Sequence, residues 1–303
     1  MEFNVHILGC GSSLPTSRHL PTSQVVNIRG KLYMIDCGEG AQRQMRQQHL
    51  SFSKLVAIFI SHLHGDHCFG LPGLLSSLGM LGRTGDLHII GPVGLEAFLR
   101  PILHQFCTGM PYEVIIHVFD TEVKQVVWDD KSVTITSLPL KHRVPTQGYL
   151  FQEKTTIRHL DKASADFYGV PRTHYPKIIA GEDFINEEGE LIPNYRLTKP
   201  GQKPRSYAYC SDTKFMPENA SLFEGVSLLY HEATFTQALK ARARQTGHST
   251  AREAAQMAIL SRAKKLLIGH YSARYHGYDE LLEEAQASFP ETIAAYEGLC
   301  IKL

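Results

Sequence analysis

The sequence has 303 residues, of which 43% are hydrophobic and 20% are charged, and its formal net charge is +1. This composition is ordinary for a globular chain, and the near-zero charge means that any nucleic-acid footprint would have to be local. Six single cysteines without a Cys-x-x-Cys pair exclude a small disulfide scaffold and favour reduced thiols in a cytoplasmic protein. No signal peptide or apolar run long enough for a membrane span is present, so no membrane partner is expected.

Short strands joined by turns are predicted for the first half of the chain. The expected strands are 3–8, 24–28, 32–35, 57–60, 88–90 and 133–138, and a helix is expected at 71–81. The second and third strands form a predicted hairpin, closed by Arg29-Gly30-Lys31.

A helix at 251–260 is predicted in the second half, with Ser249 and Thr250 as candidate caps, followed by a strand at 265–268. Strands clustered in each half, with helices between them, predict two packed sheets covered by helices. Residues 153–205 are polar and lack periodicity, so we interpret them as a surface insertion within one domain that spans 1–303.

The most informative segment is Ser-His-Leu-His-Gly-Asp-His at 61–67, directly after an expected buried strand. His62 and His64 are two residues apart in extended chain and can point the same way. The glycine that follows permits a bend, after which Asp66 and His67 can face a neighbouring point. Imidazole and carboxylate groups suit Zn²⁺ or Mn²⁺. The alternative is a polar loop whose histidines bind backbone carbonyls, but four donors at this spacing favour a metal site.

A local cluster cannot complete two metal coordination spheres, so distant donors are expected at other strand ends. His142 follows the strand predicted to end near 140, Asp212 follows the apolar Tyr-Ala-Tyr at 207–209, and His270 ends the strand predicted at 265–268. Each residue alone is more often an ordinary loop residue. Their shared position directly after a strand favours a joint role as metal ligands.

The H-x-H-x-D-H pattern with later His, Asp and His residues resembles the metallo-β-lactamase superfamily, and finer matches resemble the ribonuclease Z family in particular. These matches are residues 59–67, Gly70-Leu71-Pro72-Gly73-Leu74, Asp36-Cys37-Gly38-Glu39-Gly40, His231-Glu232-Ala233-Thr234-Phe235, Gly247-His248-Ser249-Thr250 and Ser272-Ala273-Arg274-Tyr275. The resemblance covers nearly the whole chain apart from 153–205.

The resemblance implies an α+β fold, the αββα metallo-β-lactamase sandwich, with two Zn²⁺ ions per subunit and Mn²⁺ or another divalent metal as a possible substitute. The implied ligands are His62, His64 and His142 for one ion, Asp66, His67 and His270 for the other, and Asp212 as the bridge between them. Asp36 is expected to orient these ligands through hydrogen bonds.

Two such ions make a hydroxide from water and stabilise the entering and leaving oxygens of a phosphodiester. Asp66 is the expected acceptor of the water's proton, and His248 is the expected donor to the leaving oxygen, because it matches the family's proposed general acid. Glu232 is expected to orient His248. The alternative for His248 is a neighbour of a helix cap with no chemical role.

The resemblance further implies an endoribonuclease that removes the 3′ trailer from precursor tRNA and leaves a 3′ hydroxyl on the tRNA. Arg18 and Arg274 are expected contacts for the 3′ end. Residues 153–205 take the place of the family's tRNA-binding arm, although Arg-Thr-His-Tyr-Pro at 172–176 replaces its usual Gly-Pro element. A homodimer is also implied, in which the arm of one subunit holds the tRNA cut by the other.

Two other functions remain open from the residues. One is a metallo-β-lactamase-fold hydrolase that acts on a small phosphodiester, thioester or sulfate ester. The other is a metal-stabilised RNA-binding protein without turnover, which would require an incomplete ligand set.

Overall fold

The computed structural model describes residues 2–154, 158–201 and 203–303. Their contacts divide the chain into two compact units, one formed by Met1–Gln152 with Arg205–Leu303 and the other by Glu153–Pro204. Residues 155–157 and 202 of the polar segment lie outside the described residues. No helix in the described part of the chain is long and apolar enough to cross a membrane.

The larger unit contains two seven-stranded sheets. The first has the order β18-β1-β2-β3-β4-β5-β6. Its strands are β1 (Phe3–Gly9), β2 (Ser23–Ile28), β3 (Lys31–Cys37), β4 (Leu55–Phe59), β5 (Leu87–Pro92), β6 (Val114–Phe119) and β18 (Cys300–Lys302). The five strands predicted between residues 3 and 90 are confirmed, and the predicted hairpin joins β2 to β3 with Ile28 opposite Lys31.

The second sheet has the order β17-β16-β15-β14-β9-β8-β7. Its strands are β7 (Gln125–Asp129), β8 (Val133–Lys141), β9 (Pro145–Glu153), β14 (Ser206–Cys210), β15 (Leu228–Glu232), β16 (Leu266–Gly269) and β17 (Thr292–Ala294). Strands β14 to β17 are parallel to one another, so their carboxyl ends lie along one edge of the sheet. The strands predicted at 133–138 and 265–268 are confirmed as β8 and β16.

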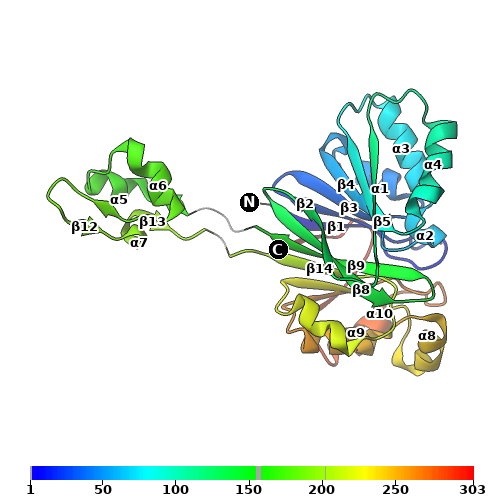
Figure 1. Cartoon of the computed structure of the whole chain (residues 1–303). Helices are drawn as coiled ribbons and strands as arrows, with labels where there is room; N and C mark the ends of the chain where they lie inside the picture. The colour runs from blue at the N-terminus through cyan, green and yellow to red at the C-terminus, as the bar shows by residue number, and fades with distance from the viewer. Residues whose placement is uncertain (1, 155–157, 202) are drawn as a thin grey trace. The chain divides into compact units, whose positions relative to one another are not determined.

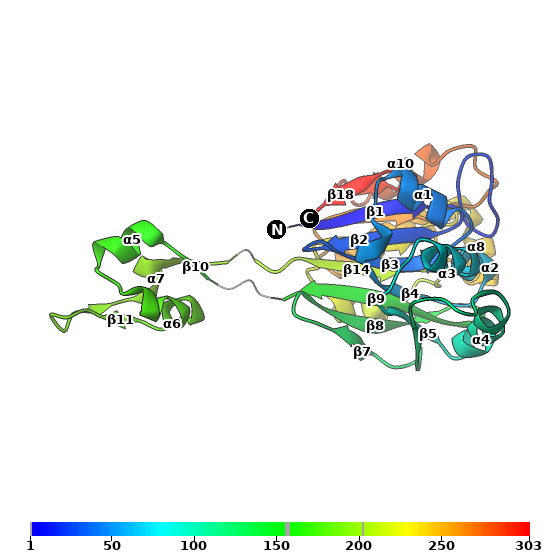
Figure 2. The same ribbon diagram turned by 90° about the horizontal axis from the view of Figure 1, so that it is seen from above.

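Helices cover the outer face of each sheet, which confirms the predicted αββα arrangement (Figures 1 and 2). Those beside the first sheet are α1 (Ala41–Gln47), α2 (Gly65–Cys68), α3 (Leu71–Met80) and α4 (Leu95–Phe106), with the 3-10 turn η1 (Phe52–Lys54). Those beside the second are α8 (Lys240–Thr246), α9 (Ala251–Leu260) and α10 (Asp279–Gln286), with η3 (Pro217–Phe223) and η4 (Gln237–Leu239). Thr250 caps α9 in a reciprocal pair with Glu253, as the sequence predicts.

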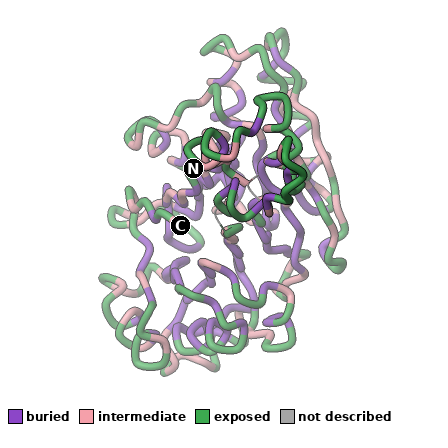
Figure 3. The backbone as a smooth tube through the Cα atoms, turned by 90° about the vertical axis from the view of Figure 1, so that its left-hand side faces the viewer, coloured by how far each residue is buried: buried purple, intermediate pink, exposed green. Residues whose placement is uncertain are grey.

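The main core lies between the two sheets, because each sheet turns an apolar face toward the other. Tyr33, Phe59 and Phe151 meet there edge to face, and all three are fully buried. A second core fills the space between the first sheet and its helices. Figure 3 shows the buried strands of both sheets in purple and the exposed outer segments in green.

The smaller unit has its own short elements and its own core. Its elements are β10 (His159–Leu160), α5 (Lys162–Phe167), η2 (Arg172–His174), α6 (Tyr175–Ala180), β11 (Phe184–Ile185), β12 (Leu191–Ile192), α7 (Asn194–Leu197) and β13 (Thr198–Lys199). Its buried side chains are Ala165, Val170, Ile178, Phe184, Ile192 and Leu197. Elements of two to six residues are too short to show a hydrophobic period, so the sequence pattern did not reveal them.

Candidate metal centre

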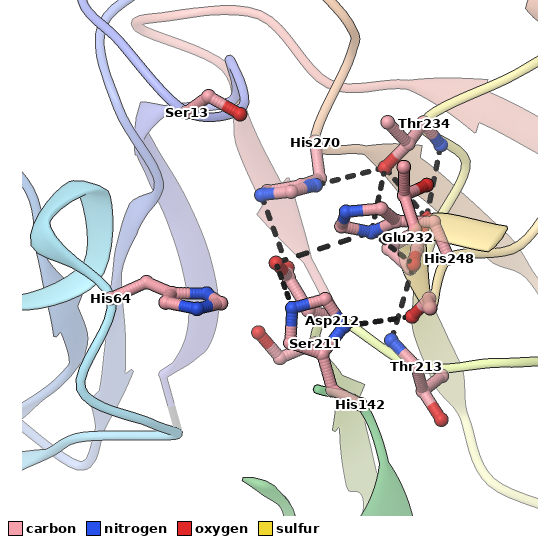
Figure 4. Close-up of polar contacts among 12 residues, drawn as sticks. Ser13, His64, His142, Ser211, Asp212, Thr213, Glu232, Thr234, His248 and His270 are labelled. Carbon is pink, nitrogen blue, oxygen red and sulfur yellow. Dashed lines mark hydrogen bonds and ion pairs between the residues drawn. The ribbon is translucent and has the colours of Figure 1, made fainter. Parts of the chain in front are cut away.

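Four strand ends bring the seven predicted ligands together at one edge of the sandwich. The chain leaving β4 carries His62 and His64 and then enters α2, which holds Asp66 and His67. The other three ligands, His142, Asp212 and His270, follow β8, β14 and β16 directly or within two residues. Their side-chain donor atoms gather into two groups, each with its atoms within 4.8 Å of one another: His62, His64, His142 and Asp212, and Asp66, His67 and His270. Part of this cluster is drawn in Figure 4.

The carboxylate of Asp212 lies between the two groups. Its Oδ2 lies 3.6 Å from His62 Nε2 and 3.8 Å from His142 Nε2. Its Oδ1 lies 3.5 Å from His67 Nε2 and 3.0 Å from His270 Nε2. Each carboxylate oxygen therefore faces a different set of imidazoles, which is the geometry of a carboxylate that bridges two cations.

The unpaired atoms of the cluster show that the residues fit metal ions. Within the described residues, Nε2 of His67, His142 and His270 and Oδ1 of Asp212 are buried and have no hydrogen-bond partner. Leaving such an atom unsatisfied costs about 1–3 kcal/mol, and coordination to a cation removes that cost. The ligand-to-ligand separations of 3.0–3.8 Å around Asp212 bracket the roughly 3.4 Å edge of a tetrahedron with zinc bonds of about 2.0–2.1 Å.

Hydrogen bonds to Nδ1 fix the tautomers that ligation requires. His67 Nδ1 donates to Asp36 over 2.8 Å, and His142 Nδ1 donates to the carbonyl of Gly247 over 2.8 Å. His270 Nδ1 lies 2.9 Å from the hydroxyl of Thr234. With the proton on Nδ1 of His67 and His142, Nε2 of each ring can present its lone pair to a cation at the centre of the cluster. Gly247 has a φ of +81°, and a Cβ there would lie 2.9 Å from His142 Nδ1, so this close approach requires glycine.

Asp36, which the resemblance implies as a residue that orients the ligands, is hydrogen-bonded to the loop at 61–67 and to Tyr209 of β14. This fully buried side chain accepts hydrogen bonds from Ser61 N at 2.7 Å, Ser61 Oγ at 2.9 Å and Tyr209 OH at 2.7 Å, besides that from His67. The hydrogen bonds of Ser61 and Tyr209 to Asp36 were not predicted from the sequence. The position of Ser61 directly before His62 was the only local signal for either residue.

The electrostatics of the cluster favour positive charge. Burial acts to raise the pKa of Asp212, but the imidazoles of His270, His67 and His62 hold it well below its usual range. Burial likewise acts to lower the pKa of His67, but Asp212, Asp36 and Asp66 raise it to about 10. A bound cation would balance the negative charge of these carboxylates in place of the second proton on His67.

Glu232 and His248 form a buried pair beside the two ligand groups (Figure 4). Glu232 ends β15, and its Oε1 accepts a 2.9 Å hydrogen bond from His248 Nδ1. Backbone N–H groups of Thr213, Thr234 and Ser249 also donate to this carboxylate. Burial acts to lower the pKa of His248, but the neighbouring Glu232 charge and hydrogen bond raise it to about 9. His248 therefore carries a proton at neutral pH while its Nε2 remains available.

The loop that follows β1 also contacts one of the predicted ligands. The backbone N–H of Ser13 donates to Asp66 Oδ2 over 2.7 Å. The far end of the same loop is held by Glu297, which binds His19 Nδ1 at 3.1 Å and Leu20 N at 2.9 Å. Sequence reasoning missed this contribution, because Glu297 is nearly 280 residues from the loop that it holds.

The two predicted substrate contacts, Arg18 and Arg274, are exposed on neighbouring loops. Arg18 Nη2 donates to the carbonyls of Ala273 at 3.2 Å and Tyr275 at 3.3 Å, on either side of Arg274. The guanidinium of Arg274 lies 5.0 Å from the ring centroid of Phe235. Arg18 thus stabilises the loop that carries Arg274.

Replacing Asp36 with asparagine is expected to weaken metal binding by about 10- to 100-fold, the usual effect of changing a group that orients a metal-bound histidine. The amide keeps the size of the side chain but loses the charge opposite His67. Competition with a chelator followed by metal analysis measures the change. Asp86→Asn, at an exposed position, is the matched control, and metal affinity equal in both variants would contradict this role for Asp36.

Comparison with known proteins gives both the fold and the family. A family model described as anti-Pycsar protein Apyc1 matches residues 3–89. Ribonuclease Z of Porphyromonas gingivalis W83 is 59% identical over 301 residues, covering 99% of each chain. Human tRNase Z, short form, superimposes with a TM-score of 0.71 at 24% identity over 98% of each chain. The metallo-β-lactamase-fold protein YhfI of Bacillus subtilis superimposes with a TM-score of 0.69 at 18% identity over both full lengths.

These structural similarities identify the two-sheet sandwich as the metallo-β-lactamase fold. The similarity to the Porphyromonas protein covers nearly the whole of both chains at 59% identity. The chain therefore belongs to the ribonuclease Z family.

Proposed function

We propose that this chain is a metal-dependent endoribonuclease that removes the 3′ trailer from precursor tRNA and leaves a 3′ hydroxyl on the tRNA. Family membership supports the substrate and the reaction. The observation that carries the chemistry is the placement of Asp212, whose two oxygens face separate groups of imidazoles.

Two Zn²⁺ ions per subunit fit this arrangement, with Mn²⁺ as a possible substitute. His62, His64 and His142 would hold one ion, Asp66, His67 and His270 the other, and Asp212 both. When bound, such a pair supplies Lewis acidity toward the phosphate and hydroxide at neutral pH.

The protein's own groups divide the proton transfers between them. Asp66 is positioned to accept the proton of the attacking water, because Ser13 N–H holds its Oδ2 at the edge of the cluster. His248 is positioned to protonate the leaving oxygen through Nε2, because its Nδ1 is bound to Glu232. Glu232 keeps His248 protonated and fixes the orientation of its imidazole ring. Arg18 and Arg274, on exposed loops, would contact the 3′ end of the tRNA.

Incubation of the protein with a precursor tRNA and mapping of the product ends tests the proposal. A cut directly after the discriminator base that leaves a 3′ hydroxyl is expected. Hydrolysis of a thioester without cleavage of precursor tRNA would favour the small-substrate alternative. Binding in a gel shift with no cleavage in zinc or manganese would favour an RNA-binding protein without turnover.

We further propose that the smaller unit contributes to tRNA binding. Strands β9 and β14 are paired with Gln152 opposite Ser206, so the two chain ends that flank the unit are adjacent. Replacing residues 154–204 with Asn-Gly should close these strands as a hairpin. The core of the larger unit shares none of the six core residues of the smaller one.

This replacement is expected to lower kcat/KM on precursor tRNA on the order of tenfold or more, because phosphate contacts supply most of the affinity for RNA. Hydrolysis of bis(p-nitrophenyl) phosphate should remain. Equal loss on both substrates would indicate misfolding, and full retention on both would contradict a role of this unit in tRNA binding.

A homodimer and a cytoplasmic location complete the proposal. The dimer is proposed on family resemblance, and sedimentation analysis tests it. All six cysteines are free and five are buried, which supports a reducing compartment.

A further inference from the structure

An open hollow of about 590 Å³ lies beside the metal loop, residues 61–67. The roles proposed above for the metal ligands, His248 and Glu232 do not involve this hollow. Arg43 and Arg46 of α1 line one side, and Phe69, which directly follows α2, lines another. Glu39 and Gln42 complete the polar lining, and glycines form the remaining wall. The hollow therefore lies between the turn that carries Asp-Cys-Gly-Glu-Gly and the turn that carries two of the metal ligands.

Phe69 connects the hollow to the metal loop. Its ring packs against Gly65, where an added Cβ would lie 2.4 Å from Phe69 Cε2. Gly65 directly precedes the ligand Asp66, and His67 is two residues before Phe69. The aromatic ring nevertheless remains 59% exposed, so one side of it is free to contact a ligand.

The chemistry of the lining suits single-stranded RNA. Arg43 and Arg46 are exposed, and neither forms an ion pair with a carboxylate among the residues that the structure describes. Two guanidinium groups outnumber the single carboxylate of Glu39, so the hollow favours phosphate. An exposed aromatic ring next to arginines without an ion pair is the combination that binds stacked bases and their backbone without reading sequence.

The direction of the RNA follows from the position of His248. Hydrolysis that leaves a 3′ hydroxyl on the tRNA breaks the bond to the 3′ oxygen of the last tRNA ribose, and that oxygen takes the proton, while the phosphate stays on the trailer. The tRNA end therefore belongs beside His248, which lies between α8 and α9 of the second sheet's layer. His64, from the first sheet's side, enters the cluster opposite His248 (Figure 4). The hollow lies on that same first-sheet side.

We propose that this hollow binds the nucleotides of the 3′ trailer that follow its first one, with a base stacked on Phe69 and phosphates bound by Arg43 and Arg46. The inference rests on the proposed function, because it assumes a precursor tRNA. It assigns the trailer to the layer of α1 and α3, and the tRNA body to the other side of the metal centre.

The test compares one tRNA carrying a trailer of a single nucleotide or of about eight nucleotides, a length within the usual footprint of a single-strand site. Arg43→Ala with Arg46→Ala, and separately Phe69→Leu, should lower kcat/KM on the long trailer about tenfold, since phosphate contacts and base stacking supply the affinity of single-strand sites. The short trailer and bis(p-nitrophenyl) phosphate should be cut at the unaltered rate. Phe69→Tyr keeps the ring and should retain activity.

Arg262→Ala is the matched control, because it removes an exposed arginine that lies far from the hollow. Arg262 comes before β16, whereas the predicted ligand His270 follows the other end of that strand. Equal losses on both trailer lengths, or none on the long trailer, would overturn the assignment. Binding of a 5′-phosphorylated oligoribonucleotide of about eight nucleotides, followed by fluorescence anisotropy, is independent of cleavage. Wild-type binding that the arginine variant loses, without any tRNA cleavage, would uphold the hollow as an RNA site and refute the proposed function instead.

Discussion

Replacing Asp212 with alanine is expected to abolish metal binding at both positions and phosphodiester hydrolysis with it. The side chain offers one oxygen to each ligand group, so its loss removes a ligand from both ions at once. It also removes a buried negative charge that attracts both cations. Loss of several kcal/mol of transition-state stabilisation corresponds to a fall in turnover of about 1,000-fold or more.

Elemental analysis of the purified variant measures the metal directly, and precursor tRNA cleavage measures turnover. A chelator should lower the melting temperature of the wild-type protein and leave that of the variant unchanged, because only a ligand that binds the native state stabilises it. Asp86→Ala, which removes an exposed carboxylate, serves as the control. Full occupancy by two zinc ions in the Asp212 variant would contradict the bridging role.

His248→Ala is expected to reduce precursor tRNA cleavage by about 100- to 10,000-fold, the usual contribution of a positioned general acid. Metal content and melting temperature should change far less than turnover, because His248 is not among the proposed ligands. The effect should depend on the leaving group. The ribose 3′ oxygen needs a proton to depart, whereas p-nitrophenolate is a stable anion and leaves without one.

Hydrolysis of bis(p-nitrophenyl) phosphate by the His248 variant should therefore stay close to the wild-type rate. His104→Ala, at an exposed position on α4, controls for loss of a histidine elsewhere. Unchanged cleavage of precursor tRNA would remove His248 from the mechanism. An equal fall on both substrates would assign it to the metal site rather than to proton transfer.

Features built from neighbouring residues were predictable from the sequence. The metal loop at 61–67, the hairpin of β2 and β3 and the capped helix α9 each depend on residues a few positions apart. Apolar periodicity and turn-forming residues are patterns of a few neighbouring positions, so both can be recognised in a single sequence. Strand ends also pointed to His142, Asp212 and His270, although family resemblance was needed to assign them to particular ions.

The tertiary structure alone decided which atoms meet. The placement of Asp212 between two imidazole groups follows from the order of β14 and β16 in the second sheet, which no local pattern encodes. The same holds for the hydrogen bond of Tyr209 to Asp36. These contacts join residues far apart in the chain, and their geometry is set by how the two sheets pack. The sequence by itself therefore determined which chemical groups are present and which strand ends or turns carry them. The packing of the sheets determined the positions of these groups relative to one another.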